Sequence, residues 1–162
     1  MKISKLKYKR RREGKTDYKA RFFLLKSGLP RLVVRKTNKY ILAQVTIAKE
    51  AQDFVEMGIS SKHLASLGWT FSFKNLPAAY MTGFLLGKKA LEKNIKKMIL
   101  DTGIIKSTKG SKIYAFVKGV IDSGVEIPHD AKVFPDNSRI LGEHTKNAEK
   151  IKNIINKIKG QK

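Results

Sequence analysis

Cysteine is absent from this 162-residue chain. Its absence excludes disulfide bonds, thiolate nucleophiles and zinc sites with cysteine ligands, and it fits a reducing compartment. The sequence also lacks any apolar run near the ~18–20 residues that a membrane-spanning helix needs. No signal peptide or lipidation motif is visible, so we expect a cytoplasmic protein without a membrane partner.

Acidic residues are scarce as well. The chain carries 13 Asp and Glu against 35 Lys and Arg, which gives a formal net charge of +22. Such an excess of one sign opposes compaction unless an anionic partner compensates it. Nucleic acid is the first candidate for that partner, ahead of an anionic membrane surface.

The positive charge is densest at the N-terminal end, where only Glu13 and Asp17 oppose the basic residues that precede Phe22. Unpaired charges at this density cannot be buried. Arginine forks bind phosphate with two hydrogen bonds, and tyrosine can stack on an unpaired base. We therefore interpret residues 1–21 as an RNA-binding arm that is disordered when free and ordered on RNA. A solvated tail that only aids solubility is the alternative.

The remaining sequence predicts a layered α/β domain with a mixed sheet and crossover helices, in the order β-β-β-α-β-α-β. Asn75 is suited to cap the first long helix, with Pro77 in its first turn. Gly83 and Gly87 lie four residues apart, which favours close packing of that helix against the sheet. The predicted strands are 31–35, 40–48, 54–57, 98–100 and 125–127, and the predicted helices are 60–67, 76–95, 111–121 and 147–159.

The predicted domain organisation has three parts: the basic arm (1–21), the α/β core (22–128) and a C-terminal extension with an amphipathic basic helix (129–162). Leu42 interrupts the alternation of the second strand, which predicts that the outer face of the sheet is partly covered. Strand 98–100 is a continuous apolar run, typical of a strand buried on both faces. Trp69, Phe71 and Phe73 are interpreted as packing residues rather than base-stacking ones.

Two further basic clusters interrupt the core. Lys106 to Lys112 lies between a strand and a helix, and combines lysines with hydroxyls and a glycine in a phosphate-binding pattern. Arg35 to Lys39 forms the predicted hairpin turn. For both clusters a solvated loop is an equally good interpretation.

Two sequence patterns could indicate an enzyme, and each has an ordinary structural interpretation. Leu100-Asp101-Thr102-Gly103 resembles an aspartic-protease signature, but Ile104 follows where those enzymes usually have a small residue. A metal-dependent nuclease would need converging carboxylates, and each candidate also has an ordinary surface or capping interpretation. We expect no catalytic residue, metal site or cofactor, and His63, His129 and His144 lack metal-ligand spacing. The candidate nuclease carboxylates are Asp53, Glu56, Asp101 and Asp122.

Four segments in register resemble one family. They are Lys9 to Arg21, Asn75 to Gly83, Thr108 to Lys112, and Ile127-Pro128-His129. Together they resemble the large-subunit ribosomal protein L-eighteen family, in its archaeal form, whose eukaryotic counterpart is L-five. The resemblance runs from about residue 7 to about residue 145, and the lysine-rich stretch after Thr145 has no match.

The resemblance implies a structural ribosomal protein that binds 5S rRNA and joins it to the large-subunit rRNA in the central protuberance, beside other large-subunit proteins. A general RNA chaperone remains an alternative. The family's RNA-binding arm carries over to Lys9, Arg10, Arg11, Arg12, Lys15, Thr16, Tyr18 and Arg21. Its hairpin and Thr-x-Gly-Ser loop carry over to Lys36, Asn38, Lys39, Lys109, Ser111 and Lys112.

Overall fold

The computed structural model describes residues 6–50, 52–145 and 147–160, so Lys2 and Lys5 of the predicted arm lie outside the described residues. Within these ranges four strands form one mixed sheet in the order β3-β2-β1-β4. Strands β1 to β3 are antiparallel neighbours, and β4 runs parallel to β1. The predicted α/β layered fold is confirmed. The strands are β1 (Arg31–Lys36), β2 (Ile41–Lys49), β3 (Gln52–Ser60) and β4 (Ile99–Asp101).

The sheet begins with a hairpin whose turn is closed by Thr37, because the Thr37 hydroxyl accepts a hydrogen bond from Tyr40 N at 2.9 Å. In β2 the apolar residues alternate as predicted as far as Val45, and Ile41, Ala43 and Val45 are buried on one face. Beyond Val45 the predicted alternation is wrong, because Thr46 is buried and Ile47 is only half-buried. The register shifts between Val45 and Thr46, where a bulge interrupts the pairing with β3. Leu42 points to the other face and is 41% exposed, so the predicted covering of that face is wrong at this position.

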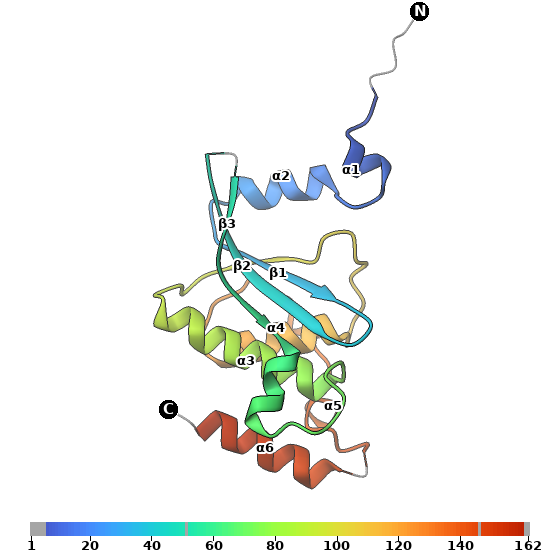
Figure 1. Cartoon of the computed structure of the whole chain (residues 1–162), viewed down its shortest axis with the longest axis vertical. Helices are drawn as coiled ribbons and strands as arrows, with labels where there is room; N and C mark the ends of the chain where they lie inside the picture. The colour runs from blue at the N-terminus through green and yellow to red at the C-terminus, as the bar shows by residue number, and fades with distance from the viewer. Residues whose placement is uncertain (1–5, 51, 146, 161–162) are drawn as a thin grey trace, which may run out of the picture.

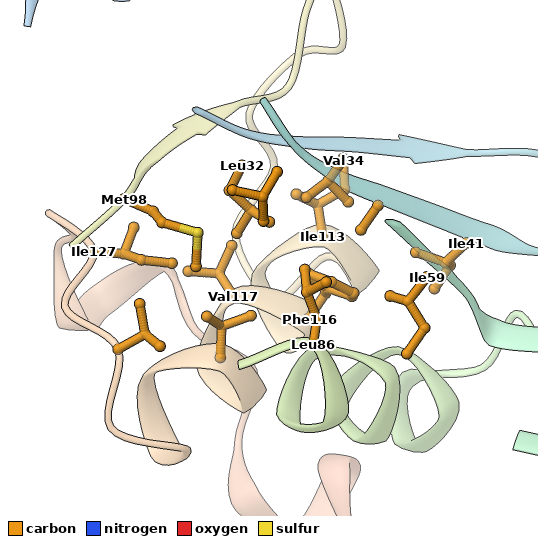
Figure 2. Close-up of a cluster of buried hydrophobic side chains, with 14 of the residues drawn as sticks. Leu32, Val34, Ile41, Ile59, Leu86, Met98, Ile113, Phe116, Val117 and Ile127 are labelled. Atoms are coloured by element: carbon orange, nitrogen blue, oxygen red, sulfur yellow. The ribbon is translucent and has the colours of Figure 1, made fainter. Parts of the chain in front are cut away.

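Helices α3 (Leu76–Glu92) and α4 (Lys112–Asp122) cover one face of the sheet. Asn75 caps α3 as predicted, accepting a hydrogen bond from Ala78 N at 2.8 Å. Figure 2 shows Leu32 and Val34 from β1 pointing toward Phe116 and Val117 of α4. The main hydrophobic core therefore lies between the sheet and these two helices.

The glycines of α3 pack against a different partner from the predicted one. A Cβ on Gly83 would meet the backbone of Phe116, and one on Gly87 would meet the Ser123 side chain. Both neighbours belong to α4 or its C-cap. The close approach predicted from the glycine spacing is present, but it is between two helices rather than between a helix and the sheet.

Two predicted strands differ in the structure. Strand β4 is at an edge of the sheet, and Ile99 and Leu100 are only half-buried, so burial on both faces is wrong. Residues 125–127 form no strand, because only an isolated parallel bridge joins Lys97 to Glu126. Val125 and Ile127 still enter the core. The alternating apolar residues of this segment therefore reflect its burial in the core, and the segment does not pair with a neighbouring strand.

A second core lies on the far side of α3. The 3-10 helix η1 (Ser61–Leu67) and helix α6 (Ala148–Gly160) pack there, with Ile151, Ile155 and Ile158 of α6 fully buried. Trp69 is buried in the same cluster and donates to Ser72 O at 3.2 Å, which confirms its packing role. The short helices η2 (Ala131–Val133) and α5 (Asn137–Ile140) connect α4 to α6.

The basic N-terminal segment contains two helices, α1 (Lys9–Arg12) and α2 (Tyr18–Lys26). Figure 1 shows them at the opposite end of the molecule from α6. Helix α2 spans the predicted boundary between arm and core, and the division into three domains stays a prediction. In the described part of the chain, no helix has the length and apolar character needed to cross a membrane.

Candidate nucleic-acid interface

The two arm helices have identifiable local causes. Asp17 caps α2, since its carboxylate accepts hydrogen bonds from Lys19 N at 2.9 Å and Ala20 N at 3.1 Å. Gly14 supplies the positive φ of +63° at the turn between the helices. The sequence predicted no element here, because the basic residues hide a capping pattern that starts at Asp17.

Side chains within the arm are partly organised. Arg10 Nε donates to the Thr16 hydroxyl at 2.9 Å, and Lys15 pairs with Glu13 at 2.9 Å. The ring of Tyr18 lies 5.1 Å from that of Tyr8. The acidic residues of the arm thus neutralise a lysine and cap a helix. The arginines of α1 are all exposed.

A cleft of about 420 Å³ separates the arm from the edge of the sheet. Its lining includes four cations and two carboxylates, together with the apolar side chains of Phe23, Leu24 and Leu100. Cations beside apolar side chains suit a phosphodiester with an unpaired base. The four cations are Arg10, Lys15, Arg21 and Arg35.

A ladder of ion pairs runs beside this cleft. Arg21 of α2 lies 2.6 Å from Asp53 of β3, and Asp53 lies 2.6 Å from Arg31 of β1. Asp101 then pairs with Arg31 and with Arg35, each at 3.1 Å. Partial burial of Asp53 raises its pKa. Arg21 and Arg31 lower it through their hydrogen bonds and their positive charges, and together they outweigh burial, so the pKa of Asp53 lies below its ordinary 3.8. We call these five residues the arginine–aspartate ladder.

The hairpin and the loop after β4 form a second basic cluster. A cavity of about 210 Å³ is lined by Lys36 from the hairpin together with Lys106, Thr108 and Ser111 from the loop and Lys112 at the start of α4. Burial, and the charges of Lys74 and Lys36, lower the pKa of Lys112. Lysines placed close together repel one another, so an anion between them is favoured.

These clusters adjoin one another along residues 101–112. Thr102 and Gly103 line the arm cleft, whereas Ile105, Lys106 and Thr108 line the hairpin cavity. Arg35 and Lys36, consecutive in β1, contribute one to each. The structure thus brings together three basic segments that lie far apart in the sequence. Of the predicted residues, Lys9, Arg11, Arg12, Asn38, Lys39 and Lys109 are exposed outside both cavities.

Three of the four candidate nuclease carboxylates have structural roles instead. Asp101 holds two arginines and also accepts a hydrogen bond from Gly103 N at 2.8 Å, which fits its predicted place at the end of a strand. Asp53 belongs to the same ladder, and Asp122 accepts a hydrogen bond from Tyr80 at 2.7 Å. Arginine side chains neutralise Asp53 and Asp101, so both carboxylates already have cationic partners.

Comparison with known proteins decides the family. The sequence profile described as "Ribosomal large subunit proteins 60S L5, and 50S L18" matches residues 2–97 and 92–130. The large ribosomal subunit protein uL18 of Korarchaeum cryptofilum is 50% identical over 140 residues, which cover 86% of this chain and 72% of that protein. The chain belongs to the uL18 family. The uL18 protein of Caldivirga maquilingensis is 48% identical over 141 residues (86% of this chain, 68% of that protein).

Membership in the uL18 family makes the chain a non-enzymatic, structural constituent of the large ribosomal subunit, associated with rRNA and ribosomal proteins. The uL18 protein of Methanococcus maripaludis is 44% identical over 155 residues, which cover 95% of this chain and 80% of that protein. Because 147 residues precede α6, an alignment of this length extends into the C-terminal helix, so the lysine-rich stretch after Thr145 also has a counterpart in a relative.

Several residues of the candidate site of this uL18 chain were not among those predicted to bind RNA, although Arg35 had been placed in the basic hairpin cluster. Arg31 and Arg35 lie four apart in a strand, so alternation places both on one face, and this was the available signal. Lys74 joins the lysine cluster only through the fold. Phe22 and Phe23 are 63% and 59% exposed on α2, although phenylalanine usually indicates burial.

Proposed function

We propose that this chain binds 5S rRNA through the continuous basic surface formed by the arm, the hairpin and the loop 102–111, and joins it to the large-subunit rRNA. The observation that supports this proposal most directly is the convergence of the three basic segments on residues 101–112. Several weak phosphate contacts held in one geometry act together and give high affinity.

Both cavities suit folded RNA better than a regular duplex. They are concave and small, and the arm cleft combines guanidinium groups with apolar side chains. Proteins read RNA mainly at loops, bulges and unstacked bases, because the major groove of an A-form helix is too narrow for side chains. In this proposal Arg10, Arg21 and Arg35 bind phosphates at the cleft, and Tyr18 contacts a base.

The remaining predicted residues have matching roles. The arginines of α1 and the lysines of the hairpin tip neutralise phosphates along the approach to the two cavities. The proposed RNA-binding residues are Lys9, Arg10, Arg11, Arg12, Lys15, Thr16, Tyr18, Arg21, Lys36, Asn38, Lys39, Lys109, Ser111 and Lys112, with Arg35, Lys74 and Lys106 added from the structure. In the assembled subunit the protein would contact neighbouring ribosomal proteins of the central protuberance.

The decisive experiment is a competition assay at physiological salt. Labelled 5S rRNA from the same organism is bound to the full chain and displaced by unlabelled 5S rRNA or by a transfer RNA pool. We expect the transfer RNA pool to compete at least about a thousandfold less well, the lower end of the usual ratio of specific to non-specific binding. Equal competition would instead indicate a general RNA chaperone.

Matched charge variants locate the surface. Arg11→Gln with Arg12→Gln removes two exposed charges from α1, and Lys150→Gln with Lys157→Gln removes two exposed charges from α6. Because α6 lies at the other end of the molecule, only the α1 pair should weaken 5S rRNA binding and lower its salt dependence. Equal losses for the two pairs would show that only net charge matters.

A further inference from the structure

Helix α2 has little apolar packing to fix its position. None of its residues is buried, and Phe22, Phe23 and Leu25 are exposed. Its first turn is nevertheless tied to the sheet by Arg21, whose guanidinium donates to Asp53 Oδ2 at 2.6 Å. This contact spans 32 residues of sequence and joins the arm directly to β3.

Asp53 is itself held in place by the rest of the arginine–aspartate ladder. Its second oxygen, Oδ1, lies 2.6 Å from Arg31, a side chain that belongs to a residue only 2% exposed. Arg31 is anchored in turn by Asp101 at the end of β4. A buried guanidinium between two carboxylates costs much to disrupt, because loss of either partner leaves an uncompensated charge.

We infer that Asp53 is a positioning residue for RNA binding: it holds Arg21, and through it α2, in the orientation that forms the arm cleft. The inference rests on the proposed function and adds to it a residue that itself contacts no RNA. Without Asp53, α2 samples other orientations, and the apparent affinity falls by the fraction of molecules that keep the binding geometry.

Net charge alone predicts the opposite change in RNA affinity when Asp53 is replaced. Replacing an aspartate in a protein of net charge +22 strengthens its attraction to a polyanion and should leave RNA binding equal or tighter. Positioning predicts weaker binding. The two effects are therefore separated by the direction of the change and not merely by its size.

The first test compares Asp53→Asn with Glu149→Gln. Both remove one negative charge, and Glu149 is an exposed residue in the first turn of α6. We expect Asp53→Asn to weaken 5S rRNA binding about tenfold, which corresponds to a fall of the competent fraction to ~0.1. Glu149→Gln should bind as tightly as the parent chain or slightly more tightly. Asp53→Glu keeps the charge and should restore most of the affinity.

A double-mutant cycle with Arg21→Gln separates positioning from general damage to the sheet. If Asp53 acts through Arg21, Asp53→Asn causes no further loss of affinity once Arg21→Gln is present. If Asp53 matters only by neutralising the buried Arg31, the tenfold loss persists in that background. Persistence of the loss, or undiminished binding by Asp53→Asn alone, overturns the inference.

A distance measurement tests the same inference without RNA. Because the chain has no cysteine, spin labels can be attached at Lys19→Cys on α2 and Lys89→Cys on α3, both exposed positions. The label-to-label distance distribution should broaden in Asp53→Asn and stay narrow in Glu149→Gln. An unchanged distribution in Asp53→Asn refutes positioning, whereas loss of 5S preference by the parent chain refutes only the proposed function.

Discussion

Gly83 on α3 faces the carbonyl oxygen of Phe116 on α4 so closely that a Cβ on Gly83 would lie 2.0 Å from that oxygen. Gly119 on α4 has the reciprocal relationship, because its Cβ would lie 2.1 Å from the carbonyl oxygen of Tyr80. The two helices therefore approach backbone to backbone, and a single methyl group forces them apart.

Gly83→Ala should destabilise the fold by about 3 kcal/mol, at the upper end of the usual cost of overpacking, because the colliding atoms are backbone and cannot rotate away. Urea denaturation followed by circular dichroism measures the loss. Gly58→Ala in β3 is the matched control, since its nearest neighbour would be the flexible Gln44 side chain at 3.4 Å. A similar stability for both variants would contradict the close approach of α3 and α4.

Tyr80 joins the same two helices by a hydrogen bond from its hydroxyl to Asp122 at 2.7 Å. Burial and the Asp122 carboxylate raise the pKa of Tyr80 above its ordinary value of 10.0. Tyr80→Phe should cost about 2 kcal/mol at neutral pH, typical of a hydrogen bond to a charged group. Denaturant melts at several pH values measure this cost.

The stabilisation of the fold by the Tyr80 hydroxyl should depend on pH. Above the ordinary tyrosine pKa the unfolded chain loses the Tyr80 proton while the folded chain keeps it, so the stabilisation is present below that pH and is lost as pH rises through the raised pKa. The difference in stability between the parent chain and Tyr80→Phe should therefore shrink in alkaline solution. A difference that stays constant with pH would show that the hydroxyl does not stabilise the fold through this bond.

Local patterns predicted most helices and strands because local chemistry sets their limits. The Asn75 cap and the apolar periodicity of α3 and α4 depend on residues a few positions apart, and the structure confirms them. The errors concern the arm helices α1 and α2, which were not predicted, and the partners of segments that were. Residues 125–127 alternate like a strand, yet they lack a ladder, and nothing within three residues could show that.

The separate parts of the candidate site were predictable from the sequence, but their arrangement in space was not. Charge density identified the arm, the hairpin and the loop as separate clusters, whereas their convergence depends on the parallel pairing of β4 with β1. Lys74 entered the lysine cluster through the packing of α3 on the sheet, a tertiary effect without a local signal. Asp53 was considered as a metal ligand because its arginine partners, 32 and 22 residues earlier in the sequence, are visible only in the fold.

Lys112 reports on the crowded lysine cluster. Burial, with the charges of Lys74 and Lys36, lowers its pKa from the ordinary 10.5 in the free protein. The charged cluster therefore reduces stability at neutral pH, and stability should rise as pH increases through the lowered pKa. Bound phosphate reverses the effect, so the pKa of Lys112 should move up on addition of 5S rRNA.

Side-chain NMR titration of Lys112 measures both shifts. Lys74→Gln should raise the pKa of Lys112 in the free protein, because it removes one of the two neighbouring charges, and it should also weaken RNA binding. Lys150→Gln on α6 changes the net charge equally and should leave the Lys112 titration where it was. A Lys112 pKa that RNA fails to raise would place the bound RNA away from this cluster.

Phe22 is an exposed aromatic residue in a helix without acidic residues, and its ring lies 5.8 Å from that of Phe23. Stacking of a base on an aromatic ring contributes ~1–3 kcal/mol, so Phe22→Ala should weaken 5S rRNA binding between about five- and a hundredfold if a base stacks there. Phe22→Tyr keeps the ring and should retain the affinity.

Phe54→Ala on β3 is the control, since that phenylalanine is 48% exposed but lies outside the basic surface. All three variants should melt within a few degrees of the parent chain, because little apolar area is buried at either position. Loss of affinity in Phe54→Ala equal to that in Phe22→Ala would show that exposed phenylalanines act non-specifically, and unchanged binding by Phe22→Ala would assign the exposed face of α2 to a neighbouring ribosomal protein instead of RNA.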